Sequence, residues 1–434
     1  MNRTPKSLRW QIGLFGRTNV GKSSFLNMVT GQDVAITSSV PGTTTDVVEK
    51  AMELLPIGPV MFLDTGGVDD ATRLSVERRQ RTRRIFERAD VFVLLVEPGC
   101  WTRFEKSIVD AARARNSSCL IVVNKIDLMP PTRDFMTMLR AQSPLVCCVS
   151  SRPSALRDRF VSAFKALLLE ALPEAGGAAP PIIGDLLPPG GLAVLIVPVD
   201  LEAPKGRLIL PQVQTIRDAL DHEATTVVVK EGQYRQVLKR FDRPPDLVVC
   251  GSQVVMQMVR ETPAEIPCTT FSILFARLKG DLCEAAMGAA AIRRLTHGDR
   301  VLIAEACTHH PVEDDIGRVK IPRWLREATG CDLTIDTYSG RDYPEDLEDY
   351  QLIVHCGACM LTRREMLARI QRASAGGVPI TNYGVCISAL HRVLQRVLEP
   401  FPEAWQAYAF HTQPHGPQAM GTTQQGDRLC SVHP

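Results

Sequence analysis

The chain has 434 residues, of which 45% are hydrophobic and 23% charged, and its formal net charge is +2. This length exceeds what one hydrophobic core usually organises, so we expect three domains. The near-neutral charge argues against a nucleic-acid partner, and no run of about 18 uncharged apolar residues is present to predict a membrane span.

Residues 1–172 alternate apolar runs of strand length with segments of helix length, an order that predicts a parallel α/β domain. A segment rich in Ala, Gly and Pro, residues 171–181, predicts a linker that separates this domain from the rest of the chain. The apolar runs are QIGLFG, VMFLD, VFVLLVE, CLIVVN and PLVCCVS.

The sequence GRTNVGKS, residues 16–23, matches the pattern GxxxxGKS and lies between a predicted strand and a predicted helix. In this context glycines let backbone amides wrap around phosphates, and the amino end of the helix adds its dipole. Lys22 would neutralise the β- and γ-phosphates, and Ser23 would bind Mg²⁺. The expected phosphate-binding residues are Gly16, Asn19, Val20, Gly21, Lys22, Ser23 and Ser24.

Two further motifs end predicted strands and complete a guanine-nucleotide site. In DTGG, Asp64 would hold Mg²⁺ through water, and the amide of Gly67 would sense the γ-phosphate. In NKID, the Asp127 carboxylate can accept both N–H donors of guanine, a pair that adenine does not offer, so the motif selects GTP over ATP. The expected base-binding residues are Asn124, Lys125, Asp127, Ser150 and Ser151.

These ordered motifs resemble those of the TrmE/Era/EngA-type GTPases and predict a Ras-like domain that hydrolyses GTP. PGTTTD, residues 41–46, takes the switch I position, where Thr44 or Thr45 would close over Mg²⁺. Val68 replaces the glutamine that positions water in Ras, so another group must stabilise the transition state. Asn19 lies where potassium-activated members of this class bind K⁺, although it could simply brace the loop. The expected catalytic residues are Lys22, Asn19, Thr44 and Asp64.

An arginine-rich segment, VERRQRTRRIFERAD, follows switch II. A run of like charges is usually a solvated face, which is the expectation here. A nucleotide-dependent contact with another domain or an acidic partner is the alternative interpretation. The arginines are Arg78, Arg79, Arg81, Arg83, Arg84 and Arg88.

Two smaller parallel-sheet α/β domains are predicted after the linker. Residues 182–265 carry the strand runs LAVLIVPV, TTVVVK and DLVVC, and their length suits a docking or dimerisation domain. Residues 268–400 begin with one long predicted helix, residues 271–295, and continue as a second open parallel sheet. The polar tail, residues 401–434, is expected to be disordered.

Thirteen cysteines in a chain whose start has no apolar signal core indicate reduced thiols and a cytoplasmic protein, so clustered Cys and His predict a metal site. CTHH (307–310) and HCGAC (355–359) each follow a predicted parallel strand, where open α/β sheets place ligand sites. The thiolates of Cys307, Cys356 and Cys359 can bind three irons of a 4Fe-4S cluster, or with one histidine they can bind zinc. Spacing alone leaves both open. Candidates for a fourth iron ligand are His309, His355 and Glu305.

The two Cys and His motifs lie among segments that extend the comparison beyond the nucleotide site. These segments are GRLILPQVQTIRDALD (206–221), TTFSILFARLKGDL (269–282), EACTHHP (305–311), VHCGACM (354–360) and TNYGVCIS (381–388). Together with the GTPase motifs they resemble the HydF family, the FeFe-hydrogenase maturation GTPases, over nearly the whole chain. The resemblance implies that the second domain mediates dimerisation and that Cys307, Cys356 and Cys359 hold a 4Fe-4S cluster in the third.

The resemblance also implies a scaffold function. The protein would receive a di-iron precursor bearing CO and cyanide, assembled with the radical-SAM maturases HydE and HydG, and deliver it to the FeFe-hydrogenase apoprotein. GTP turnover would gate the exchange of partners. Homodimers are implied, and their assembly into tetramers stays open. The alternative is an RNA-modifying or ribosome-assembly GTPase with a structural zinc domain, which lacks support because no basic stripe with interleaved aromatics is present.

Overall fold

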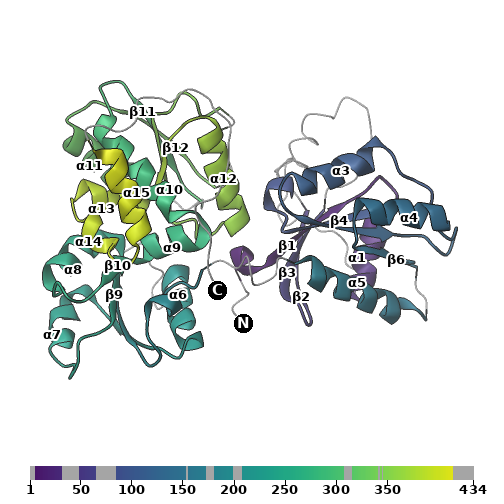
Figure 1. Cartoon of the computed structure of the whole chain (residues 1–434), viewed down its shortest axis with the longest axis horizontal. Helices are drawn as coiled ribbons and strands as arrows, with labels where there is room; N and C mark the ends of the chain where they lie inside the picture. The colour runs from purple at the N-terminus through teal and green to yellow at the C-terminus, as the bar shows by residue number, and fades with distance from the viewer. Residues whose placement is uncertain are drawn as a thin grey trace. The chain divides into compact units, whose positions relative to one another are not determined.

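The computed structural model describes residues 5–31, 48–64, 85–152, 155–172, 180–198, 208–306, 315–340, 343–344 and 346–413 (Figure 1). The chain divides into two compact units. Unit 1 comprises residues 1–181, 277–280 and 358–372, and unit 2 comprises residues 182–276, 281–357 and 373–434. Among the helices within the described ranges, none combines the length and the apolar character needed to cross a membrane.

Unit 1 contains a six-stranded sheet in the order β2-β3-β1-β4-β5-β6, in which β2 runs antiparallel to β3 and the other pairs are parallel. This arrangement confirms the predicted Ras-like α/β domain. The strands are β1 (Trp10–Phe15), β2 (Val48–Leu54), β3 (Gly58–Asp64), β4 (Val91–Val96), β5 (Ser118–Val123) and β6 (Val146–Cys148). The helices are α1 (Lys22–Thr30), α3 (Arg103–Arg113), α4 (Arg133–Gln142) and α5 (Arg157–Ala171).

Helices pack on both faces of this sheet. Since successive strand residues point to opposite faces, most residues of β1, β3, β4 and β5 are buried. Phe25 of α1 and Phe164 of α5 pack on one face, with alternate strand residues such as Val93. Ile108 of α3 and Leu139 of α4 pack on the other face. The strands therefore read as continuous apolar runs, and their carboxyl ends present the loops between strand and helix.

Unit 2 contains two parallel four-stranded sheets, which confirms the two further parallel-sheet domains (Figure 1). The first has the order β10-β9-β7-β8, formed by β7 (Leu192–Ile196), β8 (Thr225–Val229), β9 (Leu247–Cys250) and β10 (Cys268–Thr270). The second has the order β12-β11-β13-β14, formed by β11 (Arg300–Ala304), β12 (Thr334–Tyr338), β13 (Leu352–His355) and β14 (Ile380–Asn382).

Helices follow most of these strands, as parallel connections require. With the first sheet of unit 2 are α6 (Leu210–Asp221), α7 (Tyr234–Leu238) and α8 (Val255–Glu261). With the second are α10 (Leu282–Ala290), α11 (Ile321–Thr329), α13 (Tyr383–Leu390) and α15 (Pro402–Thr412), whereas α14 (Leu394–Val397) contacts β10 of the first. The helices α9 (Phe271–Lys279) and α12 (Arg363–Ala375) have residues in both units.

The structure corrects three sequence-based expectations. The expected single helix over residues 271–295 is broken after Lys279, because Asp281 caps a new helix by accepting the Glu284 backbone N–H at 3.1 Å. The second domain does not end at residue 265, because β10 adds to its sheet. The tail after residue 401 is not disordered at its start, since α15 packs on α10 and buries Tyr408.

Candidate functional site

The loop between β1 and α1 has the geometry of a phosphate-binding loop. Gly16 (φ +150°) and Gly21 (φ +96°) take conformations that side chains disfavour, and Asn19 (φ +65°) takes the left-handed region that asparagine tolerates. Lys22 is buried, and its Nζ donates to the carbonyls of Gly16 and Arg17 at 2.8 and 2.9 Å. The loop therefore holds its lysine at the amino end of α1, where the helix dipole also favours anions.

Asn124 fastens the phosphate loop to the base-binding loops. Its side chain is 1% exposed, and its Nδ2 donates to the Val20 carbonyl at 2.9 Å. Its Oδ1 accepts from the backbone N–H and the hydroxyl of Ser151 at 3.2 and 2.9 Å. A side chain on Gly21 would meet Asn124, with the new Cβ 2.4 Å from Nδ2. Asn124, which directly follows β5, thus joins three loops of the site: its own loop, the phosphate loop and the loop after β6.

Asp127 is oriented by the loop after β6, as a guanine-binding carboxylate requires. The Ser150 hydroxyl donates to Asp127 Oδ1 at 2.7 Å, and Arg152 lies 3.5 Å from Oδ2. The Asp127 side chain remains 28% exposed, so its carboxylate is accessible to a base. Lys125 (φ +62°) pairs with Glu97 at 2.5 Å, which holds its side chain alongside the loop after β4.

The structure brings the described nucleotide residues to one edge of the sheet. Asp64 ends β3 directly beside β1, in register with Leu14, and is 8% exposed. Ser23 and Ser24 are exposed in the first turn of α1. Thr44, Thr45, Gly67 and Val68 lie outside the described residues, so their expected roles stay predictions.

A brace on the phosphate loop was not anticipated from the sequence. Arg17 Nε donates to Glu105 Oε1 at 2.7 Å, and Glu105 is 2% exposed. Burial alone would raise the pKa of Glu105, but hydrogen bonds from Arg17 and Thr102 bring that pKa below its ordinary value. Glu105 also completes a capping box with Thr102 at the start of α3. The pattern TRFE is the local signal of that box, whereas its arginine partner lies 88 residues away.

The strands that lead into the two cysteine motifs, β11 and β13, are neighbours in the second sheet of unit 2. Ala304, which ends β11, is in register with His355, which ends β13. Just beyond these strand ends, the backbone N–H of Ala306 donates to Cys356 Sγ at 3.0 Å. Hydrogen bonds of this kind stabilise metal-bound sulfur and tune its cluster. Ala306, which directly precedes Cys307 in the chain, therefore lies beside Cys356 at the carboxyl edge of this sheet.

Two candidates for the fourth ligand have other partners. Glu305 is 3% exposed, and its Oε2 accepts from Arg318 at 3.0 Å and from Ser339 at 2.8 Å. His355 is fully buried, and its Nδ1 lies 2.8 Å from the Cys356 carbonyl oxygen. Cys307 and His309 lie outside the described residues. Among the residues that the structure describes, no group of three His, Cys, Asp or Glu side chains is arranged to hold a metal ion.

Among the thiols that the structure describes, Cys356 and Cys359 are partly exposed, as are Cys100, Cys148, Cys283 and Cys331. Five others are buried in the cores. Burial raises the pKa of Cys268 to about 11 and those of Cys119, Cys147 and Cys386 to about 12, and it raises that of Cys250 well above its ordinary range.

Family models match the chain in three consecutive segments. Residues 182–280 match the hydrogen maturase F dimerization domain, and residues 283–400 match the hydrogen maturase F tetramerization domain. The chain belongs to the hydrogen maturase F family. Residues 11–125 match the 50S ribosome-binding GTPase model, so the first domain of this hydrogen maturase F member is a GTPase domain. The dimerization and tetramerization domains support a homo-oligomer.

Curated relatives match a limited part of this hydrogen maturase F chain. The tRNA modification GTPase MnmE of Synechococcus sp. (strain JA-2-3B'a(2-13)) is 44% identical over 126 residues, which are 28% of this chain and 26% of that protein. GTPase Der of Heliobacterium modesticaldum is 35% identical over 135 residues, 30% of each chain. The chain thus spans less than a third of the length of these relatives.

Among solved structures, Era of Aquifex aeolicus bound to GDP.AlF4- is 25% identical to the hydrogen maturase F chain, with a TM-score of 0.31. The match covers 38% of this chain and 57% of that chain.

Proposed function

We propose that this protein is a GTP-regulated scaffold that carries a 4Fe-4S cluster and delivers a di-iron precursor to the FeFe-hydrogenase apoprotein. The observation that carries the proposal is the Ala306 N–H bound to Cys356 Sγ. It joins the ends of two parallel strands that lead into the CxH and HCxxC motifs. A metal site on this edge, in a chain of the hydrogen maturase F family, is best explained by an iron-sulfur cluster.

Cys307, Cys356 and Cys359 would hold three irons of this cluster. Three thiolates leave the fourth iron for another ligand, so the cluster can supply an attachment point for a second metal unit. The Ala306 amide would stabilise the charge on the Cys356 sulfur. The engagement of Glu305 by Arg318 and Ser339 favours a supporting role for that carboxylate.

The GTPase domain would act as a timer for partner exchange. Ser23 and Asp64 would bind Mg²⁺, and Thr44 or Thr45 would close over it in the GTP state. HydE and HydG would assemble the precursor, and the hydrogenase would accept it. Loss of the γ-phosphate then changes the switch conformation and with it the affinity for one of these partners.

Anaerobic purification of the full chain tests this proposal. The protein should be brown, absorb broadly in the visible range and contain about four irons per chain. After incubation with HydE and HydG it should activate the hydrogenase apoprotein. Colourless protein with one zinc per chain would instead support an RNA-directed GTPase, the alternative suggested by the first domain's similarity to MnmE.

Potassium activation is a separate prediction. Asn19 is exposed in the phosphate loop and has a positive φ, so its side chain is open to solvent. A K⁺ ion there would offset transition-state charge in place of an arginine. We expect GTP hydrolysis to be several-fold faster in KCl than in NaCl, and Asn19→Ala to remove that difference. Equal wild-type rates in the two salts would exclude the role given to Asn19.

A further inference from the structure

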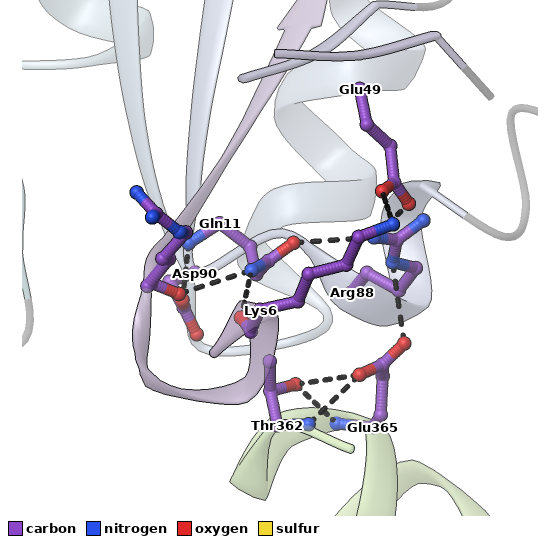
Figure 2. Close-up of polar contacts among 8 residues, drawn as sticks. Lys6, Gln11, Glu49, Arg88, Asp90, Thr362 and Glu365 are labelled. Atoms are coloured by element: carbon purple, nitrogen blue, oxygen red, sulfur yellow. Dashed lines mark hydrogen bonds and ion pairs between the residues drawn. The ribbon is translucent and has the colours of Figure 1, made fainter. Parts of the chain in front are cut away.

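Arg88, the member of the arginine run that falls within the described residues, is not solvated. It is 4% exposed, at the end of a helical segment, residues 85–88, that precedes β4. Its guanidinium donates to Glu49 Oε1 at 2.7 Å and forms an ion pair with Glu365 Oε1 at 3.2 Å (Figure 2). It also lies 3.3 Å from Gln11 Oε1. We call Gln11, Glu49, Arg88 and Glu365 the Arg88 cluster.

The members of this cluster come from distinct functional stretches of the chain. Glu49 is the second residue of β2, the strand that follows the switch I motif at residues 41–46. Arg88 lies on the segment that follows the switch II motif at Asp64. The ion pair between Glu49 and Arg88 therefore links the two segments that follow switch I and switch II in the chain. Gln11 belongs to β1, which leads into the phosphate loop.

Glu365 lies in the segment of residues 358–372, which also contains the candidate cluster ligand Cys359. It caps α12, since its Oε2 accepts the Thr362 backbone N–H at 2.9 Å (Figure 2). The same segment, residues 358–372, is grouped with unit 1. A second anchor holds its start, because the Ser7 hydroxyl donates to the Cys359 carbonyl at 2.8 Å. Cys359 is thus fixed through its own backbone and through the helix that follows.

A further charge pair supports the same attachment. Arg364 Nε lies 3.6 Å from Asp90 Oδ1, and Asp90 Oδ2 accepts the Gln11 backbone N–H at 2.8 Å. Burial raises the pKa of Asp90 to about 6, so this carboxylate is charged at neutral pH and pairs with the arginine. The buried Lys279 also donates to the Ser7 carbonyl at 3.3 Å.

We propose that the Arg88 cluster transmits the nucleotide state to Cys359. The inference rests on the proposed function, in which GTP moves the switches and Cys359 holds iron. A shift of either switch displaces Glu49 or Arg88 relative to Glu365. A buried arginine between two carboxylates tolerates such a shift poorly, so Glu365 and the start of α12 move with it. The position of Cys359 then depends on whether GTP or GDP is bound.

Hydrogen–deuterium exchange of the metal-free full chain tests this coupling. We compare Mg·GDP with a non-hydrolysable GTP analogue and follow the amides of residues 358–366. In the wild type we expect exchange to differ at least about threefold between the two nucleotides. Glu365→Gln should remove this difference, because glutamine can still cap α12 but has no charge for Arg88. GTP hydrolysis by that variant should stay within about twofold of wild type.

Asp336→Asn is the matched control, since it removes a 2.7 Å ion pair with Arg300 elsewhere in the chain and should leave the nucleotide-dependent difference intact. If Glu365→Gln does not fold, Arg88→Lys replaces it, because an ammonium cannot hold both carboxylates in the same geometry. An unchanged difference in the folded variant, or none in the wild type, overturns the coupling. The experiment contains no iron, so iron content measured separately decides the proposed function.

Discussion

Replacement of Cys356 by serine should abolish cluster binding while GTP hydrolysis continues at the wild-type rate. The Cys356 sulfur accepts a hydrogen bond from the Ala306 amide, and the residue is partly exposed. Serine is a poor iron ligand at neutral pH, and two thiolates do not retain a 4Fe-4S cluster. We expect iron to fall from about four per chain to below about one, with loss of hydrogenase activation.

Cys331→Ser is the matched control for this experiment. Cys331 is also partly exposed and in unit 2, but its sulfur contacts the Leu295 and Thr329 carbonyls at 3.5 Å. Iron content and GTP hydrolysis should both survive in this variant. Full iron in Cys356→Ser, or loss of hydrolysis along with the iron, would contradict the separation of the two sites.

Asp127→Asn should exchange the base specificity of the GTPase domain. The asparagine amide keeps one acceptor for the Ser150 hydroxyl that now orients Asp127 at 2.7 Å. It places an N–H donor against a donor of guanine, so we expect GTP affinity to fall by about a thousandfold or more. Xanthine presents a carbonyl at the matching position, and xanthosine triphosphate should therefore bind and be hydrolysed.

Nucleotide binding measured by titration, and phosphate release with each triphosphate, check this result. Asp134→Asn makes the same chemical change on an exposed turn of α4 and should leave GTP affinity unaltered. A variant that binds neither triphosphate despite a wild-type melting temperature, or that still prefers GTP, would remove Asp127 from the base site.

The nucleotide site could be predicted from the sequence because each of its motifs is local. A strand, a glycine-rich loop and a helix follow one another in the chain, so spacing alone places Lys22 at the phosphates. The structure adds the links between motifs, such as the side chain of Asn124 that holds Val20 and Ser151. These links depend on the order of strands in the sheet, and the hydrophobic periodicity of the sequence does not reveal that order.

The Arg88 cluster could not be predicted from the sequence. An arginine-rich run is usually solvated, yet Arg88 is buried between carboxylates 39 and 277 residues away in the chain. Burial of one charge requires partners that only tertiary structure supplies. The break between α9 and α10 has a local cause, unlike the burial of Arg88. Gly280 and the helix-capping Asp281 mark the break, but the apolar pattern that runs through both helices favoured one long helix.

The contrast between exposed and buried thiols has a consequence for how the metal is acquired. Iron binds thiolates, and a thiol with a pKa of about 12 is almost fully protonated at neutral pH. The core thiols Cys119, Cys147 and Cys386 are therefore silent toward iron and sulfide as long as the chain is folded. Loading the folded protein would leave the partly exposed thiols to take up metal, and Cys356 and Cys359 are two of these. A chain that takes up iron before folding has no such protection, so the order of folding and loading decides where the metal goes.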